Sequence, residues 1–230
     1  MHMNTRPPAG NLPAFSAIIL DMDGLVLDSE STYCDAWRKA AAETGHQLSE
    51  TYLESLFGRH ADDVVLALAK ALGPGFDRAV FFRAAERHWF EHIEAHGIPQ
   101  MPGVVSLLAG FRERSTPFAL ATNSDSHYAS LCLERGGLSD AFPVKVTRDQ
   151  VASGKPAPDL FLEAAHRLGV APSDCLVLED SETGLLAARA AGTQPILIQR
   201  QNGLRDKLSH HAILALPSLC DLVDMINERL

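Results

Sequence analysis

The chain has 230 residues, of which 46% are hydrophobic and 21% are charged. This length suits one large core, or one domain that carries a smaller second one, and the composition is ordinary for a soluble globular protein. The net charge of −9 argues against a nucleic-acid surface and against an anionic membrane surface, because both require basic patches. No segment approaches the roughly 18–20 apolar residues that span a bilayer.

The first strand that we predict, at 17–20, is a short apolar run that ends in Asp21, Asp23 and Gly24. A long helical stretch follows it, with helices expected at 32–44, 49–57, 61–72, 77–96 and 104–114. Strands and helices then alternate. Strands are expected at 117–122, 144–146, 174–180, 195–199 and near 212–215, and helices at 126–136, 158–169, 183–191 and 218–229. This alternation predicts an α/β fold with a doubly wound parallel sheet.

The helical stretch is longer than the fold needs. About 90 residues separate the first two strands, whereas a crossover connection needs only about a dozen. We therefore predict an inserted all-helical domain at residues 31–98 and a core formed by residues 14–30 and 99–230. Because the insertion begins directly after the acidic strand end, we expect it to lie over those carboxylates as a lid.

The N-terminus and the cysteines bear on location. Residues 1–13 lack the apolar stretch of a signal peptide and are rich in proline, so we expect a disordered leader. The four cysteines lie far apart and form no metal-binding cluster: Cys34, Cys132, Cys175 and Cys220. We interpret them as reduced thiols of a cytoplasmic protein.

Polar residues follow four of the predicted elements. They are Asp21 with Asp23; Thr122, Asn123 and Ser124; Lys155 in Gly154-Lys155-Pro156; and Glu179 with Asp180. Ligands of open parallel sheets bind at the carboxyl ends of the strands, so these groups should converge. Carboxylates suit Mg²⁺, and a hydroxyl, a backbone amide and an ammonium suit phosphate oxygens. The set predicts metal-dependent phosphoryl transfer through an aspartyl phosphate.

These motifs resemble those of the haloacid dehalogenase (HAD) superfamily of aspartate-nucleophile phosphotransferases. The motifs that carry the resemblance are Asp21-Met22-Asp23-Gly24, Thr122-Asn123-Ser124, Gly154-Lys155-Pro156 and Leu178-Glu179-Asp180-Ser181-Glu182-Thr183-Gly184. The resemblance covers residues of about 15 to 200 in the family's order. It implies a Rossmann-like core, a C1-type cap in place of the helical insertion, and membership of the β-phosphoglucomutase-like and sugar-phosphatase subgroup.

The resemblance also implies a role for each residue. Asp21 would be the nucleophile, and Asp23 the acid that protonates the leaving alcohol and then the base that activates water. Thr122, Asn123, Ser124 and Lys155 would bind the phosphate, and Arg59 would reach the substrate from a loop between two cap helices. The Mg²⁺ shell would comprise Asp21, Asp180 and the backbone carbonyl of Asp23, with Glu179 a direct or an indirect ligand. An aspartate at position 23 favours phosphate esters over halogenated or phosphonate substrates.

We therefore predict a Mg²⁺-dependent phosphatase that acts on a small phosphorylated metabolite, either a sugar phosphate or a nucleoside monophosphate, and works as a monomer. One alternative is a sugar phosphomutase of the β-phosphoglucomutase type. Against it, Tyr33 stands where that resemblance leads us to expect a histidine, and few cations occupy residues 57–61. A second alternative is a non-enzymatic phospho-acceptor domain, which has no use for so large a helical insertion.

Several weaker signals have ordinary structural explanations. Asp28 and Ser29 are expected to cap the first helix of the insertion, although a role facing the substrate stays open. His88, His92 and His96 share one helix face, which we interpret as exposed and polar rather than metal-binding. The aromatic residues Trp89 and Phe90, alongside Phe81 and Phe82, are expected to lie in the core of the cap rather than to form a substrate platform.

Overall fold

The computed structural model describes residues 12–56 and 61–228. The predicted leader falls almost entirely outside the described residues, and Arg59 lies outside them as well. Among the described helices, none is long and apolar enough to cross a membrane.

The sheet has six parallel strands in the order β3-β2-β1-β4-β5-β6, which confirms the predicted doubly wound α/β fold. The strands are β1 (Ala17–Leu20), β2 (Phe118–Ala121), β3 (Val144–Val146), β4 (Cys175–Glu179), β5 (Gln194–Ile198) and β6 (Leu214–Leu216). β1 lies in the middle, where Ile18 pairs with Phe118 of β2 on one side and with Leu176 of β4 on the other. This central position explains why β1 is apolar throughout: both of its faces are buried.

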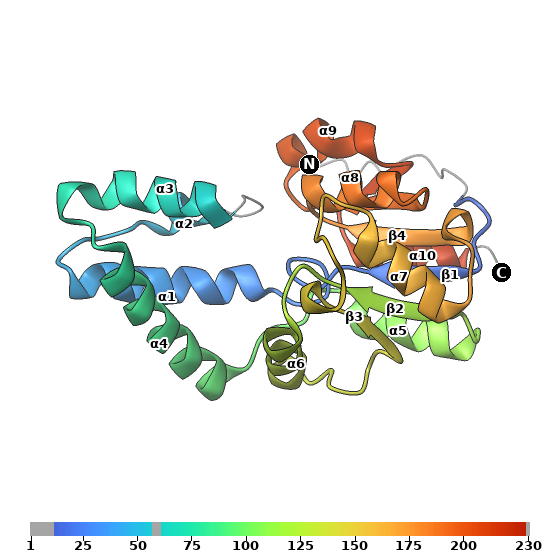
Figure 1. The fold of residues 1–230 in the computed structure, drawn as a ribbon, viewed down its shortest axis with the longest axis horizontal. Coiled ribbons are helices and arrows are strands. Elements are labelled where there is room, and N and C mark those ends of the chain that lie inside the picture. Colours follow the sequence, from blue (N-terminus) through green and yellow to red (C-terminus); the bar gives the residue numbers. More distant parts are fainter. Residues whose placement is uncertain (1–11, 57–60, 229–230) are drawn as a thin grey trace, which may run out of the picture.

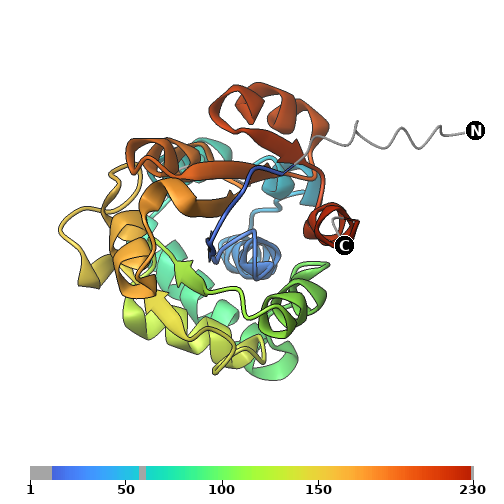
Figure 2. The ribbon, with the colours of Figure 1, turned by 90° about the vertical axis from the view of Figure 1, so that its right-hand side faces the viewer.

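Helices cover both faces of the sheet (Figures 1 and 2). They are α5 (Val104–Glu113), α6 (Ser126–Arg135) and α10 (Leu219–Asn227) on one face, and α7 (Asp159–Leu168) and α8 (Glu182–Ala190) on the other. Alternate residues of β1 serve the two layers, since Ile18 and Leu20 pack with the first set and Ala17 and Ile19 with the second. One helix, α9 (Asn202–Leu208), is absent from the sequence-based prediction, because seven largely polar residues carry no clear helical pattern. Short 3₁₀ turns lie at Gly73–Gly75, Arg148–Gln150, Pro172–Asp174 and Ser209–His211.

Four helices between β1 and α5 form a separate body beside the sheet, called the helical insert below (Figure 1). They are α1 (Ser29–Glu43), α2 (Glu50–Glu54), α3 (Ala61–Leu72) and α4 (Arg78–His96). The helical insert has its own buried cluster, which includes Leu53, Leu68 and Phe81. Its exact boundaries as a domain remain a prediction.

The chain enters and leaves the helical insert through two adjacent linkers. Asp28 N donates to Pro99 O at 2.8 Å, and Met101 N donates to Val26 O at 3.0 Å. The expected cap of α1 is present, because the Asp28 carboxylate accepts from Ser31 N. Ser29 is itself the first residue of α1, so the helix begins three residues earlier than predicted.

The histidine face of α4 differs from the expectation. His88 contacts the Glu43 carboxylate of α1 at 2.8 Å, and His92 contacts Asp35 of α1 at 3.4 Å. Their side chains are 15% and 20% exposed, so they lie in the α1–α4 interface, and only His96 is exposed as predicted. The sequence pattern showed a shared face but could not show that α1 supplies carboxylates opposite it.

Candidate active site

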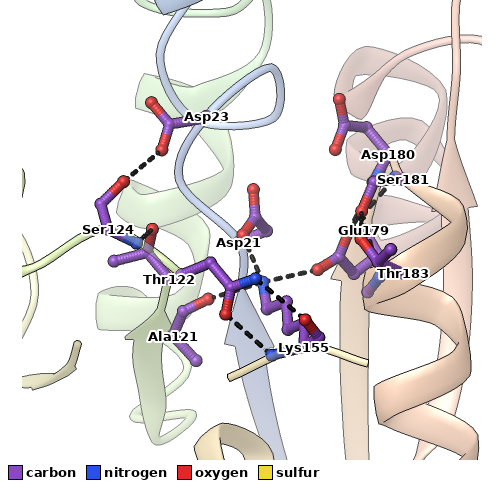
Figure 3. A network of polar contacts seen from close by, with 12 residues as sticks. Asp21, Asp23, Ala121, Thr122, Ser124, Lys155, Glu179, Asp180, Ser181 and Thr183 are labelled. Carbon is purple, nitrogen blue, oxygen red and sulfur yellow. Dashed lines mark hydrogen bonds and ion pairs between the residues drawn. The ribbon is translucent and has the colours of Figure 1, made fainter. Parts of the chain in front are cut away.

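The structure brings the four predicted motifs together at the carboxyl ends of β1, β2 and β4 (Figure 3). Lys155 lies at the centre of this arrangement, on the loop before α7. Its ammonium group contacts the Asp21 carboxylate and donates to Glu179 Oε1 at 2.6 Å and to Ala121 O at 3.0 Å. Lys155 is therefore a buried, fully bonded cation rather than a surface lysine.

The loop that carries Lys155 is held by Asn123. Asn123 Oδ1 accepts from Lys155 N at 2.8 Å, and Asn123 Nδ2 donates to Lys155 O at 3.2 Å. The side chain of Asn123 thus fixes the position of Lys155, and its backbone N–H is the group that we expect to meet a phosphate. Thr122, which is 1% exposed, accepts from Ser124 N at 3.0 Å through its Oγ1 atom.

Asp23 occupies a different environment from Asp21, although only one residue separates them. Its carboxylate accepts from Ser29 Oγ at 2.7 Å and from Ser124 Oγ at 3.0 Å. Burial raises the pKa of Asp23, and the two serine hydroxyls oppose that rise. Ser124, predicted to bind substrate, orients Asp23 in this structure. Ser29, for which the sequence leaves a role facing the substrate open, contacts Asp23 directly, and its only sequence signal is its place after the acidic turn.

Three carboxylates form a cluster beside Lys155. Oxygen atoms of Asp21, Glu179 and Asp180 all lie within 4.8 Å of one another. Burial raises the pKa of Asp21 to about 7 and raises the pKa of Asp180 well above its usual value. Burial alone would lower the pKa of Lys155, but the carboxylates of Asp21 and Glu179 outweigh that effect and raise it.

The cluster suits a divalent cation, because one ammonium group faces three close carboxylates. Glu179 is the least available of the three. Its Oε1 atom accepts from Lys155, and its Oε2 atom accepts from Asp180 N, Ser181 N and Ser181 Oγ at 2.9–3.2 Å. Asp21 and Asp180 are therefore the side chains best placed to hold a metal, and the Asp23 carboxylate lies outside the cluster.

Metal binding should depend on pH through Asp21. Between its ordinary pKa of 3.8 and its raised value of about 7, the metal-free native state keeps a proton that the unfolded chain has released. The contribution of Asp21 to the free energy of unfolding therefore falls as pH rises through this window. Because Mg²⁺ binds the ionised carboxylates, we expect added MgCl₂ to raise Tm more at about pH 8 than at about pH 6. Differential scanning calorimetry with MgCl₂ or EDTA checks this, and an equal or larger rise at the lower pH would contradict it.

Glycine packs directly against the carboxylates. A Cβ atom on Gly184 of α8 would overlap the Glu179 carboxylate, and one on Gly24 would overlap Asp180 Oδ2. We expect Gly184→Ala to displace Glu179 from Lys155, to destabilise the protein by about 1–3 kcal/mol and to lower activity. Urea unfolding measures the stability change. Gly203→Ala on α9 is the matched control, because no atom lies within 4 Å of its added Cβ, and equal effects of the two changes would contradict the argument.

A cavity of about 870 Å³ opens from these residues toward the helical insert. Asp21, Thr122 and Lys155 line its inner end. Tyr33, Trp37 and Phe82 of the helical insert line its outer part, so Phe82 faces the cavity and is not confined to the core of the insert. Trp89 is buried as expected, stacked between the rings of Tyr33 and Tyr128. Phe81 is buried as well, whereas Phe90 is exposed, contrary to the prediction, because it lies on the outward face of α4.

The fold, the strand-end motifs and the carboxylate cluster define a hydrolase of the haloacid dehalogenase-like family. The chain belongs to this family, whose model matches residues 15–192. It is 32% identical over 185 residues to the Escherichia coli fructose-1-phosphate phosphatase YqaB. This match covers 79% of this chain and 95% of that protein. It is 33% identical over 211 residues to a Drosophila melanogaster protein named "Probable pseudouridine-5'-phosphatase", covering 88% of this chain and 89% of that protein.

A solved structure from Thermotoga maritima, described as a "putative beta-phosphoglucomutase", superposes with a TM-score of 0.79 at 28% identity. The match covers 94% of this chain and 100% of that one, so it includes the helical insert as well as the sheet.

Proposed function

We propose that this protein is a Mg²⁺-dependent phosphatase that hydrolyses a small phosphate monoester, a sugar phosphate or a nucleoside monophosphate, through an aspartyl phosphate on Asp21. The observation that carries the proposal is the buried Lys155 ammonium group, which contacts Asp21 and Glu179 next to Asp180. The names of the Escherichia coli and Drosophila melanogaster relatives support phosphomonoester hydrolysis.

The two aspartates would act in sequence. A carboxylate oxygen of Asp21 attacks phosphorus, and the bond from phosphorus to the ester oxygen breaks as Asp23 donates a proton to that oxygen. Asp23 then takes a proton from a water molecule that attacks the phosphorus of the aspartyl phosphate. The products are inorganic phosphate and the restored Asp21 carboxylate. The hydroxyl groups of Ser29 and Ser124 hold Asp23 in place for both proton transfers.

The transferring phosphoryl group would meet several fixed donors. Lys155, Thr122 and the backbone N–H of Asn123 would bind its oxygens, and Glu179 would act by holding Lys155. The side chains of Asp21 and Asp180 and the backbone carbonyl of Asp23 would hold Mg²⁺, which when bound neutralises charge on the phosphoryl oxygens.

A phosphate-release screen tests the proposal. Purified protein should release inorganic phosphate from at least one monoester of a panel of sugar phosphates and nucleoside monophosphates, and EDTA should abolish the release. If Mg²⁺ but not Ca²⁺ restores the release of phosphate, the metal assignment is supported, because the two ions differ in size and coordination. Release that persists in EDTA would refute it.

A phosphomutase is the second candidate, favoured by the Thermotoga maritima structure. It would convert β-glucose 1-phosphate into glucose 6-phosphate in the presence of a bisphosphate activator, without net release of phosphate. Coupled assays that measure glucose 6-phosphate and inorganic phosphate in the same sample separate the two candidate functions.

We further propose that the protein acts as a cytoplasmic monomer. The described cysteines are free thiols, as in a reducing compartment, and a helical insert beside the site leaves no need for a second subunit to cover it. Size-exclusion chromatography with light scattering checks the monomer.

A further inference from the structure

Beyond the metal cluster, the 870 Å³ cavity combines negative charge with apolar surface. Three carboxylates come from three elements: Glu30 of α1, Asp63 of α3 and Glu182 of α8. The rings of Trp37 and Phe82, from the helical insert, line the same cavity. Among the described residues that line the cavity, Lys155 is the only lysine or arginine, and its ammonium group already contacts Asp21 and Glu179.

The charge of this wall extends to the inner end of the cavity. Glu182 is only two residues from Asp180 and both line the cavity, so the carboxylates of the wall and of the metal cluster act on the same space. Like charges repel more strongly in a cleft with low-dielectric walls than in open water. A substrate with a second phosphate or a carboxylate in its leaving group would bring that charge toward this wall.

We propose that the cavity selects phosphate monoesters whose leaving group carries no negative charge, and that Asp63 is a specificity-determining residue. This inference rests on the proposed phosphatase function. An uncharged sugar, polyol or nucleoside can donate hydroxyl hydrogen bonds to the carboxylates and place its apolar face against Trp37 or Phe82. An anionic leaving group is instead repelled by these carboxylates. The cavity thus discriminates against the wrong substrate through an unfavourable contact.

Two matched substrate pairs test the proposal on the wild-type protein. They are sorbitol 6-phosphate against 6-phosphogluconate, and fructose 1-phosphate against fructose 1,6-bisphosphate. In each pair the second compound adds one anionic group far from the reacting ester. We expect kcat/KM to be at least about tenfold higher for the uncharged leaving group, and the ratio to shrink in about 0.5 M NaCl, because salt screens exposed charges.

Variants of the helical insert then locate the discrimination. Asp63→Asn should reduce each ratio by about threefold or more, mainly through a lower KM for the anionic compound. Glu50→Gln removes an equal charge from an exposed residue of α2 that does not line the cavity, and it should leave both ratios unchanged.

The outcomes separate two failures. Absence of phosphate release from every compound, with folded protein, would refute the proposed phosphatase. Phosphate release with equal or better kcat/KM for the anionic members would overturn the specificity inference alone. So would ratios that Asp63→Asn leaves unchanged.

Discussion

Asp21→Asn should lower kcat of phosphate release by about 10⁴-fold, because an amide oxygen cannot act as the nucleophile that forms the aspartyl phosphate. The change is nearly isosteric, and Lys155 keeps its hydrogen bonds to Glu179 and Ala121 O. In the absence of metal we expect the variant to be at least as stable as the wild type, since it removes one of three crowded carboxylates.

Steady-state kinetics, thermal unfolding and circular dichroism together check this result. Asp140→Asn changes an exposed carboxylate outside the cavity and should keep full activity. Wild-type turnover by Asp21→Asn, after mass spectrometry has excluded deamidation, would show that the nucleophile is another group.

Lys155→Met should have the largest effect on stability. Methionine fills similar space but leaves the carboxylates of Asp21 and Glu179 buried without their shared cation. Removing one partner from a buried ion pair costs about 3–5 kcal/mol. Activity should also be lost, because the ammonium group that would bind the phosphoryl oxygens is gone.

Chemical unfolding of Lys155→Met beside Lys145→Met provides the comparison. Lys145 is exposed and donates to Ser139 O, so its replacement should change the free energy of unfolding by about 0.5 kcal/mol or less. Adding Glu179→Gln to Lys155→Met should restore part of the lost stability, because it removes one of the stranded charges. A Lys155→Met protein as stable as the wild type would contradict the buried ion-pair network.

Local patterns were sufficient to predict the sheet and the convergence of the site. β1 and β4 are continuous apolar runs that end in acids, and the rule that ligands bind at the carboxyl ends of parallel strands brings Asp21, Thr122 and Asp180 together. The resemblance added the separate roles of Asp21 and Asp23, which no periodicity could supply.

Contacts between distant segments could not be predicted in the same way. Asp21 and Asp23 both follow β1, but the strand ends at Leu20, and Asp23 turns toward Ser29 and Ser124. The pairing of His88 with Glu43 likewise depends on how α1 and α4 pack. Such contacts follow from tertiary structure rather than from local sequence.

The central position of β1 has a consequence for synthesis of the chain. Its two neighbours in the sheet, β2 and β4, begin at Phe118 and Cys175, so the first strand to leave the ribosome waits longest for its partners. Contacts of such large sequence separation form slowly, whereas the local contacts of α1 to α4 can form early. A nascent chain that stops before β4 would therefore carry Asp21 on an apolar strand with one edge unpaired, next to helices that are already folded. We expect chaperones to bind such a chain before its active site can form.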